Sequence, residues 1–187
     1  QDVRLLKNPR FRRLLEARVL GHAAQNAMAY ALLILVVEKS GSSVDTTLLV
    51  MAYTIPTVIL GIPAGTVADL LPRRLTMATC QLLRAGVALA LIYYHGDLFY
   101  IYVLAATASG IGQFFSPAES AVVPAVVRRD QLPAASSLMV LTQVLAQMGG
   151  MVALAPVLIK LIDPRAVFVA CAGLFVGATF IIGWMAT

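Results

Sequence analysis

Charged side chains are scarce in this sequence. Only 12% of the 187 residues are Asp, Glu, Lys or Arg, whereas 60% are hydrophobic and the mean hydropathy is +0.86. Water-soluble domains carry about 25% charged residues. A soluble chain of this length could not bury so much apolar surface, but a lipid bilayer can surround it. The composition therefore predicts an integral membrane protein.

Cysteine and histidine are also rare. Cys80 and Cys171 both fall inside apolar stretches, so we expect two buried thiols rather than a disulfide. His22 and His95 lie in different parts of the chain, with no cysteine or second histidine near either. A metal site needs several ligands that converge. We therefore expect no metal ion and no cofactor.

Catalytic motifs are missing as well. The sequence holds no GxSxG, no HExxH and no P-loop, which predicts that the protein is not an enzyme. A nucleic-acid-binding protein would need a solvated basic face with aromatic residues. The net charge of +5 is explained instead by the membrane topology described below, and we expect no nucleic-acid partner.

Long apolar stretches are what the sequence has in abundance. A membrane-spanning helix needs roughly 20 mostly apolar residues. The strict alternation of β-barrel strands and the polar face of soluble helices are both absent. Six windows qualify, at about residues 19–38, 46–69, 75–94, 98–116, 134–161 and 166–186. We predict an all-α membrane protein with six transmembrane helices.

Positive charge is spread unevenly around these windows. Six basic residues precede the first window, and two arginines stand in each of the second and fourth breaks, while the other breaks hold only three. By the positive-inside rule, both termini lie in the cytoplasm and the protein lies in the inner membrane. We expect residues 1–18 to form a basic amphipathic segment on the anionic inner leaflet, before a transmembrane domain at 19–187.

Uncharged polar side chains occur inside three windows. They are His22, Gln25, Asn26, Gln113, Gln143 and Gln147. The first three of these share one helical face at i, i+3 and i+4, and the last two are one helical turn apart. Polar groups are costly in lipid, so we expect them to face the bundle interior or a cavity. Interhelical hydrogen bonding and lining of a substrate cavity both remain open.

Two charged residues lie deeper than the others. Arg84 is about ten residues into the bilayer from Arg74, on the order of 15 Å along a helix. Glu119 is an acidic residue near the helix interiors, at the end of the fourth window. A charge at this depth must snorkel, pair or face water. We expect a structural partner for Arg84, such as Glu119 or Asp69, with substrate or lipid-headgroup binding as the alternative.

Prolines mark bends and ends. Pro56 and Pro63 each remove a backbone hydrogen bond from the second helix, as static kinks or as a bend that shapes a gate. Pro117 predicts the end of the fourth helix, followed by an amphipathic cytoplasmic linker at 118–131. The breaks DLLPRR and KLIDPR echo each other on opposite sides of the membrane. That echo favours two three-helix units of inverted topology.

The stretch GTVADLLPRR resembles the signature loop between helices two and three of the major facilitator superfamily. That pattern reads Gly, three residues, Asp, a basic residue, any residue, Gly, then two basic residues. Gly65, Asp69, Arg73 and Arg74 match, whereas a leucine and a proline replace the usual basic residue and glycine. The stretches LLKNPRFRRLLEARVL, GIPAGTVAD with QLLRAG, and FFSPAESAVVPAVVRRDQLPAASSL resemble the siderophore and multidrug exporter branch.

This resemblance implies the N-terminal six-helix half of a twelve-span secondary transporter, which exports a small amphipathic molecule by alternating access. It implies that spans one and four line the path and that spans two and five meet a second half, on the same chain or another. Asp69, Arg73 and Arg74 would belong to a charge cluster at the cytoplasmic gate. The other expected partners are membrane lipids.

Three departures from the family pattern keep a rival hypothesis open. Span one has no acidic residue near Gln25, the segment MGGMVALAP rearranges the usual helix-five pattern, and the chain holds six spans rather than twelve. The chain also begins with Gln. The rival is a non-transporting structural subunit of a larger membrane complex, derived from the same fold.

Overall fold

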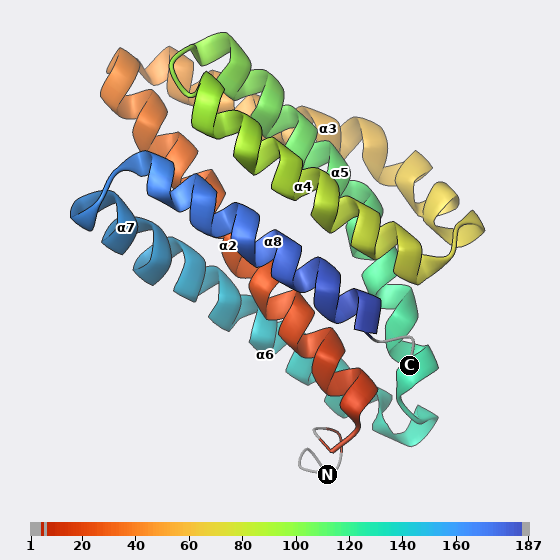
Figure 1. Cartoon of the computed structure of the whole chain (residues 1–187). Helices are drawn as coiled ribbons and strands as arrows, with labels where there is room; N and C mark the ends of the chain where they lie inside the picture. Colours follow the sequence, from red (N-terminus) through yellow and green to blue (C-terminus); the bar gives the residue numbers. More distant parts are fainter. Residues whose placement is uncertain (1–4, 6, 185–187) are drawn as a thin grey trace.

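The computed structural model describes residue 5 and residues 7–184, apart from the side chains of Ala68 and Asp69. All regular elements in this described part are helical, and six helices are long and apolar enough to cross a membrane (Figure 1). The predicted all-α, six-span fold is therefore confirmed.

The six spans follow one another with short connections. They are α2 (Pro9–Ser40), α3 (Ser43–Leu70), α4 (Arg73–Tyr94), α5 (Leu98–Val126), a fifth span of three pieces, and α8 (Pro164–Trp184). The fifth span consists of α6 (Leu132–Met148), the π-helical η2 (Gly149–Leu154) and α7 (Ala155–Leu161), and the 3-10 turn η1 (Arg129–Gln131) precedes it.

Short polar side chains start three of the helices. Asn8, Ser42 and Asp97 stand at the N-caps of α2, α3 and α5, and each accepts a hydrogen bond from a backbone N–H of the first turn. These bonds satisfy N–H groups that a helix leaves free at its start. Gly41, at φ 60°, ends α2 in the left-handed conformation that glycine adopts without strain.

Two helix boundaries differ from the prediction. The first helix begins at Pro9 instead of near residue 19, because Asn8 caps it and the basic turns continue the same helix. Arg18 is therefore 8% exposed inside the bundle, not on a separate surface segment.

The fourth helix also differs, because α5 continues through Pro117 and Pro124 to Val126 instead of ending at residue 116. Neighbouring helices can satisfy backbone groups that a proline leaves free within a membrane bundle. Pro117 and Pro124 leave free the carbonyls of Gln113 and Ser120, four residues earlier, and Arg73 Nη1 donates to the neighbouring Ala121 carbonyl at 2.8 Å. The predicted linker at 118–131 is therefore largely helical.

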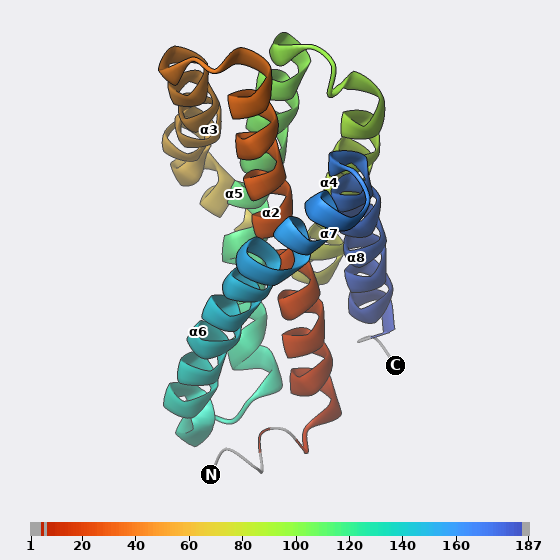
Figure 2. The same cartoon turned by 90° about the vertical axis from the view of Figure 1, so that its left-hand side faces the viewer.

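The helices form three layers, seen edge-on in Figure 2. One outer layer holds α4 and α8, the middle layer holds α2 and α5, and the third layer holds α3 and the fifth span. Within this arrangement α8 packs on α2 as α4 packs on α5, and the fifth span packs on α2 as α3 packs on α5. The same pattern of contacts results when spans one, two and three are exchanged with spans four, five and six. The two units are inverted, because consecutive spans run in opposite directions.

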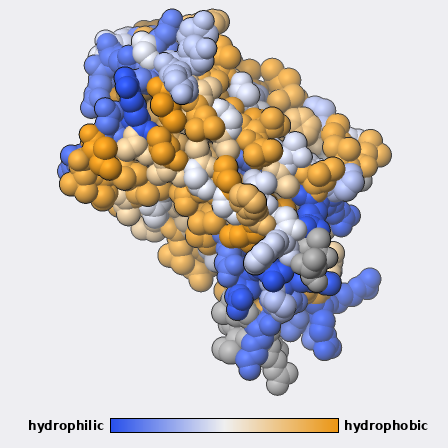
Figure 3. Space-filling model, viewed as in Figure 1, coloured by the Kyte–Doolittle hydropathy of each residue, from blue (hydrophilic) through white to orange (hydrophobic). Residues whose placement is uncertain are grey.

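The third layer is the least covered. Only 11% of the α3 window and 17% of the fifth-span window are buried, against 39–50% for the other four spans. The packing between α3 and the fifth span is slight, and side chains of the middle layer such as Gln25 and Gln113 are only half-buried. An apolar belt separates two hydrophilic ends of the molecule (Figure 3), as expected for a protein in a bilayer.

One close helix contact depends on a glycine in the π-helical turn. A Cβ at Gly150 would collide with the backbone carbonyl of Ala23 in α2. Small residues let membrane helices approach closely and pack by van der Waals contact. Gly150 therefore allows the fifth span to lie directly against α2.

Candidate functional site

A group of polar side chains is enclosed where the middle layer meets α4 and α6. We call it the central polar cluster, and four of its members are almost fully buried: Arg18 (8% exposed), Arg84 (3%), Glu119 (3%) and Gln81 (0%). His22 and Gln143 complete it by contacts with Glu119 and Arg18. Ionisable groups at this depth in a membrane protein mark candidate functional sites.

Arg18 is the most highly coordinated member of this cluster. Its Nη1 donates to Glu119 Oε2, its Nη2 donates to Gln143 Oε1 at 2.6 Å, and its Nε donates to the Met139 carbonyl at 3.2 Å. His22 Nε2 lies 3.6 Å from the same Glu119 oxygen. The planar guanidinium therefore joins α2, α5 and α6 by charge-assisted hydrogen bonds.

Sequence reasoning missed the role of Arg18, because it was grouped with the surface arginines that precede the first window. A signal was present: Arg18, His22 and Gln25 are spaced i, i+4 and i+7 and therefore share one helical face. That face carries the predicted polar residues into the bundle.

Arg84 does not form the ion pair with Glu119 that the sequence suggested. Arg18 occupies Glu119 Oε2, and the Arg84 guanidinium lies over the Phe115 ring, 5.3 Å from the ring centroid. The other proposed partner, the Asp69 side chain, lies outside the described residues. Stacking on an aromatic face orients a guanidinium but does not cancel its charge.

Two glycines make room for the polar side chains of α4. A Cβ at Gly112 of α5 would lie 2.6 Å from Arg84 Nη2, and a Cβ at Gly21 of α2 would collide with Gln81 Nε2. Both long side chains therefore extend from the outer layer to the backbone of the middle layer. A larger residue at either glycine would displace them.

The predicted cavity residue Gln113 contacts α3. Its Nε2 donates to Thr57 Oγ1 at 3.2 Å, and Ser109, one turn earlier on α5, donates to the Tyr53 carbonyl at 2.6 Å. These bonds fix α5 to α3 at mid-membrane. The Gln113 side chain is nevertheless only half-buried.

The remaining cavity candidates are distributed between α2 and α6. Gln25 and Asn26 are half-buried on α2, where Asn26 Nδ2 donates to the His22 carbonyl at 2.8 Å. Gln143 and Gln147 are exposed on α6, and Gln143 accepts the bond from Arg18 described above. The structure therefore brings His22 and Gln143 together around one ion pair, whereas Gln147 lies apart from it.

The arginines of the predicted gate motif bind helix ends within this bundle. Arg74 donates from Nε to the Ile182 carbonyl at 2.8 Å and from Nη2 to the Gly183 carbonyl, while Arg73 binds α5 as described. Cations favour the C-terminal carbonyls of a helix. Gly65 is half-buried in the last part of α3, and the side chain of Asp69 is outside the described residues.

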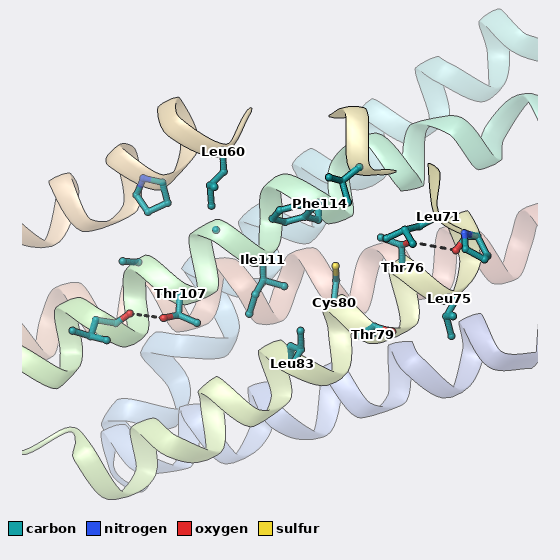
Figure 4. A pocket seen from close by; sticks show the side chains of 16 residues that line it. Leu60, Leu71, Leu75, Thr76, Thr79, Cys80, Leu83, Thr107, Ile111 and Phe114 are labelled. Carbon is teal, nitrogen blue, oxygen red and sulfur yellow. Dashed lines mark hydrogen bonds between the residues drawn. The ribbon is translucent and has the colours of Figure 1, made fainter. Parts of the chain in front are cut away.

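An apolar groove of about 820 Å³ runs between α3 and α4, with α5 as its floor (Figure 4). Leu60, Leu83, Ile111 and Phe114 point into it. The hydroxyl of Thr107, which also lines it, is used within its own helix, where it donates to the Val103 carbonyl at 2.8 Å. The groove suits an apolar chain such as a lipid tail, and it is separate from the central polar cluster.

Sequence comparison identifies the family. The profile of the Major Facilitator Superfamily matches residues 18–187. The chain belongs to this superfamily. Its six apolar helices and this membership make it an integral membrane protein of a family of transporters, which are generally not enzymes.

A curated relative supports this assignment to the major facilitator superfamily. The uncharacterized MFS-type transporter YkuC of Bacillus subtilis (strain 168) is 30% identical over 139 residues. The match covers 72% of this chain but only 32% of YkuC, so the chain spans about a third of that relative. No solved structure matches the chain significantly.

Proposed function

We propose that this chain is one six-helix half of a secondary transporter, which exports a small amphipathic molecule by alternating access with a second six-helix half. The partly exposed face of the middle layer carries this proposal, because Gln25 and Asn26 of α2 and Gln113 of α5 are only half-buried, and α3 packs little on the fifth span. A second half docked on α3 and the fifth span would close that face around a path near the bilayer midplane.

The polar side chains of the middle layer support this path. Gln25 and Asn26 on α2 and Gln113 on α5 are half-buried, and each offers amide donors and acceptors. A substrate could exchange hydrogen bonds with these amides while its apolar part contacts the neighbouring side chains. Pockets that combine an apolar wall with a few polar groups are typical of small-molecule sites.

We further propose that both termini are cytoplasmic, that the membrane is the inner one, and that the chain belongs to the siderophore and multidrug exporter branch. Gly65, Asp69, Arg73 and Arg74 would form the cytoplasmic gate. The bonds of Arg73 and Arg74 to α5 and α8 would hold this loop in place. If Asp69→Asn left both transport and the accessibility of the gate unchanged, the gate assignment would be refuted.

A vesicle assay tests the transport proposal. The whole protein that contains this chain would be produced in everted membrane vesicles, and uptake of two amphipathic dyes, ethidium and carboxyfluorescein, would be measured with and without a pH gradient. Asn26→Leu should slow uptake of a transported dye several-fold. Val169→Leu, at a side chain 56% exposed on α8 in the outer layer, should leave uptake unchanged. Failure to move either dye above empty vesicles would count against export of amphipathic molecules.

The second candidate is a structural subunit of a larger membrane complex. It is favoured by the bonds of Arg18, Arg73 and Arg74, which serve cohesion within this single bundle. The mass of the protein purified from native membranes, with its partners identified, separates the two candidates. A tight complex with unrelated subunits and no dye transport would support the structural role.

A further inference from the structure

Arg84 is a buried cation that has no counter-charge of its own among the side chains that the structure describes. It is 3% exposed, its Nε has no hydrogen-bond partner among the described residues, and it takes part in none of the ion pairs found there. The single buried carboxylate of the central polar cluster, Glu119, is already bonded to Arg18. The cluster therefore holds two guanidinium groups and one carboxylate.

Further polar atoms near Arg84 are also unsatisfied. In the part of the chain that the structure describes, the buried side-chain atoms without hydrogen-bond partners are Arg84 Nε, both amide atoms of Gln81, the Tyr53 hydroxyl, His22 Nε2 and the second carboxylate oxygen of Glu119, Oε1. Tyr53 and Glu119 lie close enough to Arg84 for electrostatic interaction. Buried polar groups in proteins are normally hydrogen-bonded, so such a concentration of free donors and acceptors points to a missing partner. The excess positive charge makes an anion the expected partner.

The position of Arg84 connects it to the proposed substrate path. It begins on α4, in the outer layer, but its Nη2 lies against Gly112 of α5 in the middle layer. The amide nitrogen of Gln25 is 4.0 Å from the position that a Gly112 Cβ would occupy. The absence of a side chain at Gly112 therefore lets the guanidinium reach the polar face of α2.

We propose that Arg84 binds an oxyanion group, a carboxylate or phosphate, of the amphipathic molecule that the protein transports. This inference rests on the proposed function, since it places that molecule between α2 and α5. The guanidinium presents a fork of donors that matches a carboxylate or phosphate, and Phe115 holds its plane. Gln81 and Tyr53 supply neutral donors on α4 and α3.

Binding of a charged and a neutral probe of equal shape tests this proposal. The whole protein that contains this chain would be purified in neutral detergent, and 1-naphthoate and 1-naphthamide would be titrated by calorimetry. We expect saturable binding of 1-naphthoate and at least tenfold weaker binding of 1-naphthamide. Equal affinity for the two probes, or no binding of either, would overturn the proposal.

Matched variants connect the binding to Arg84. Arg84→Gln should weaken 1-naphthoate binding at least tenfold, with Arg84→Lys intermediate. Arg10→Gln, at an exposed position on the first turn of α2, should bind like the wild type. Gly112→Ala should weaken binding by displacing the guanidinium, but Gly61→Ala, where nothing lies within 4 Å, should not. Wild-type affinity in Arg84→Gln would refute the assignment.

Thermal unfolding separates an anion site from a merely structural arginine. Removal of an uncompensated buried charge should leave the unfolding temperature of ligand-free Arg84→Gln equal or higher, because the charge is costly to bury. The wild type should gain stability with 1-naphthoate, and Arg84→Gln should not. A large loss of stability in ligand-free Arg84→Gln would instead show that Arg84 holds the bundle together, and the proposal would fall.

Binding measurements in nanodiscs distinguish an anionic group of the transported molecule from an anionic lipid headgroup. With the protein in phosphatidylcholine, replacing part of the lipid by phosphatidylglycerol should not change the affinity for 1-naphthoate. Competition by phosphatidylglycerol would assign the site to lipid headgroups and overturn the assignment to the transported molecule. In the vesicle assay, transport of ethidium alone would leave the transport proposal standing but contradict this one. Binding of 1-naphthoate without any dye transport would contradict only the transport proposal.

Discussion

Neutralisation of Glu119 should destabilise the protein strongly. Arg18 is 8% exposed and Glu119 3% exposed, and the carboxylate is the anionic partner of a guanidinium whose other two partners are neutral. Removing one member of a buried ion pair costs about 3–5 kcal/mol, because the other charge is left buried and uncompensated. In Glu119→Gln the amide retains a hydrogen-bond acceptor, so we expect a loss at the lower end, about 3 kcal/mol.

A double-mutant cycle isolates the pair from the rest of the cluster. The free energy of unfolding would be measured by SDS titration in mixed micelles, followed by circular dichroism, for Arg18→Gln, Glu119→Gln and the double variant. The double variant should be more stable than the sum of the single losses predicts, with a coupling of about 2 kcal/mol, within the usual range for contacting residues.

An exposed pair provides the control. Arg12 and Glu16 form an i, i+4 salt bridge at 3.4 Å, but their side chains are 61% and 50% exposed. Solvent screening limits such a pair to about 0.3–0.5 kcal/mol. If the coupling between Arg18 and Glu119 were no larger than that of this control, the buried pair and the reasoning built on it would be refuted.

Two further predictions concern the packing of the fifth span and the C-terminal end of α8. Gly150→Val should lower the free energy of unfolding by about 1–3 kcal/mol, because the new side chain would meet the Ala23 backbone. Gly149→Val, with nothing near its Cβ position, should lower it by less than half as much in the same SDS titration. Arg74→Gln should free the carbonyl of Ile182, cost about 1 kcal/mol, and speed amide hydrogen exchange in the last turns of α8; unchanged exchange there would argue against this anchoring.

The transmembrane architecture followed from hydropathy because a bilayer imposes helix length directly. Long apolar windows and polar breaks locate all six spans, whereas the orientation inferred from the charge in the breaks stays a prediction. The sequence predicts too late a start for α2, because a basic turn before an apolar window resembles a surface segment. Pro117 predicts a helix end because proline disrupts isolated helices, but a bundle can satisfy the free backbone groups, and α5 continues.

The candidate site was only partly predictable. The sequence identifies Arg84 and Glu119 as charges in the membrane. Which arginine pairs with Glu119 depends on the packing of the helices, and that packing cannot be derived from the sequence alone. Arg18 reaches Glu119 from α2. The path of the Arg84 side chain depends on Gly112 of α5, where a Cβ would lie against Arg84 Nη2. Contacts that depend on the absence of a side chain leave no local pattern in the sequence.

The π-helical turn in the fifth span has a consequence for how this protein can change over time. A π-turn holds one more residue than the α-helical path it replaces, so residues before and after Gly149–Leu154 keep the faces they would have in a regular helix one residue shorter. Deletion of one residue within the turn should therefore restore a regular helix and leave α7 facing as it does now, whereas deletion of one residue within α6 would rotate the residues that follow by about 100°. Lineages of this chain should accept the loss of one residue in this turn far more readily than a loss elsewhere in the fifth span.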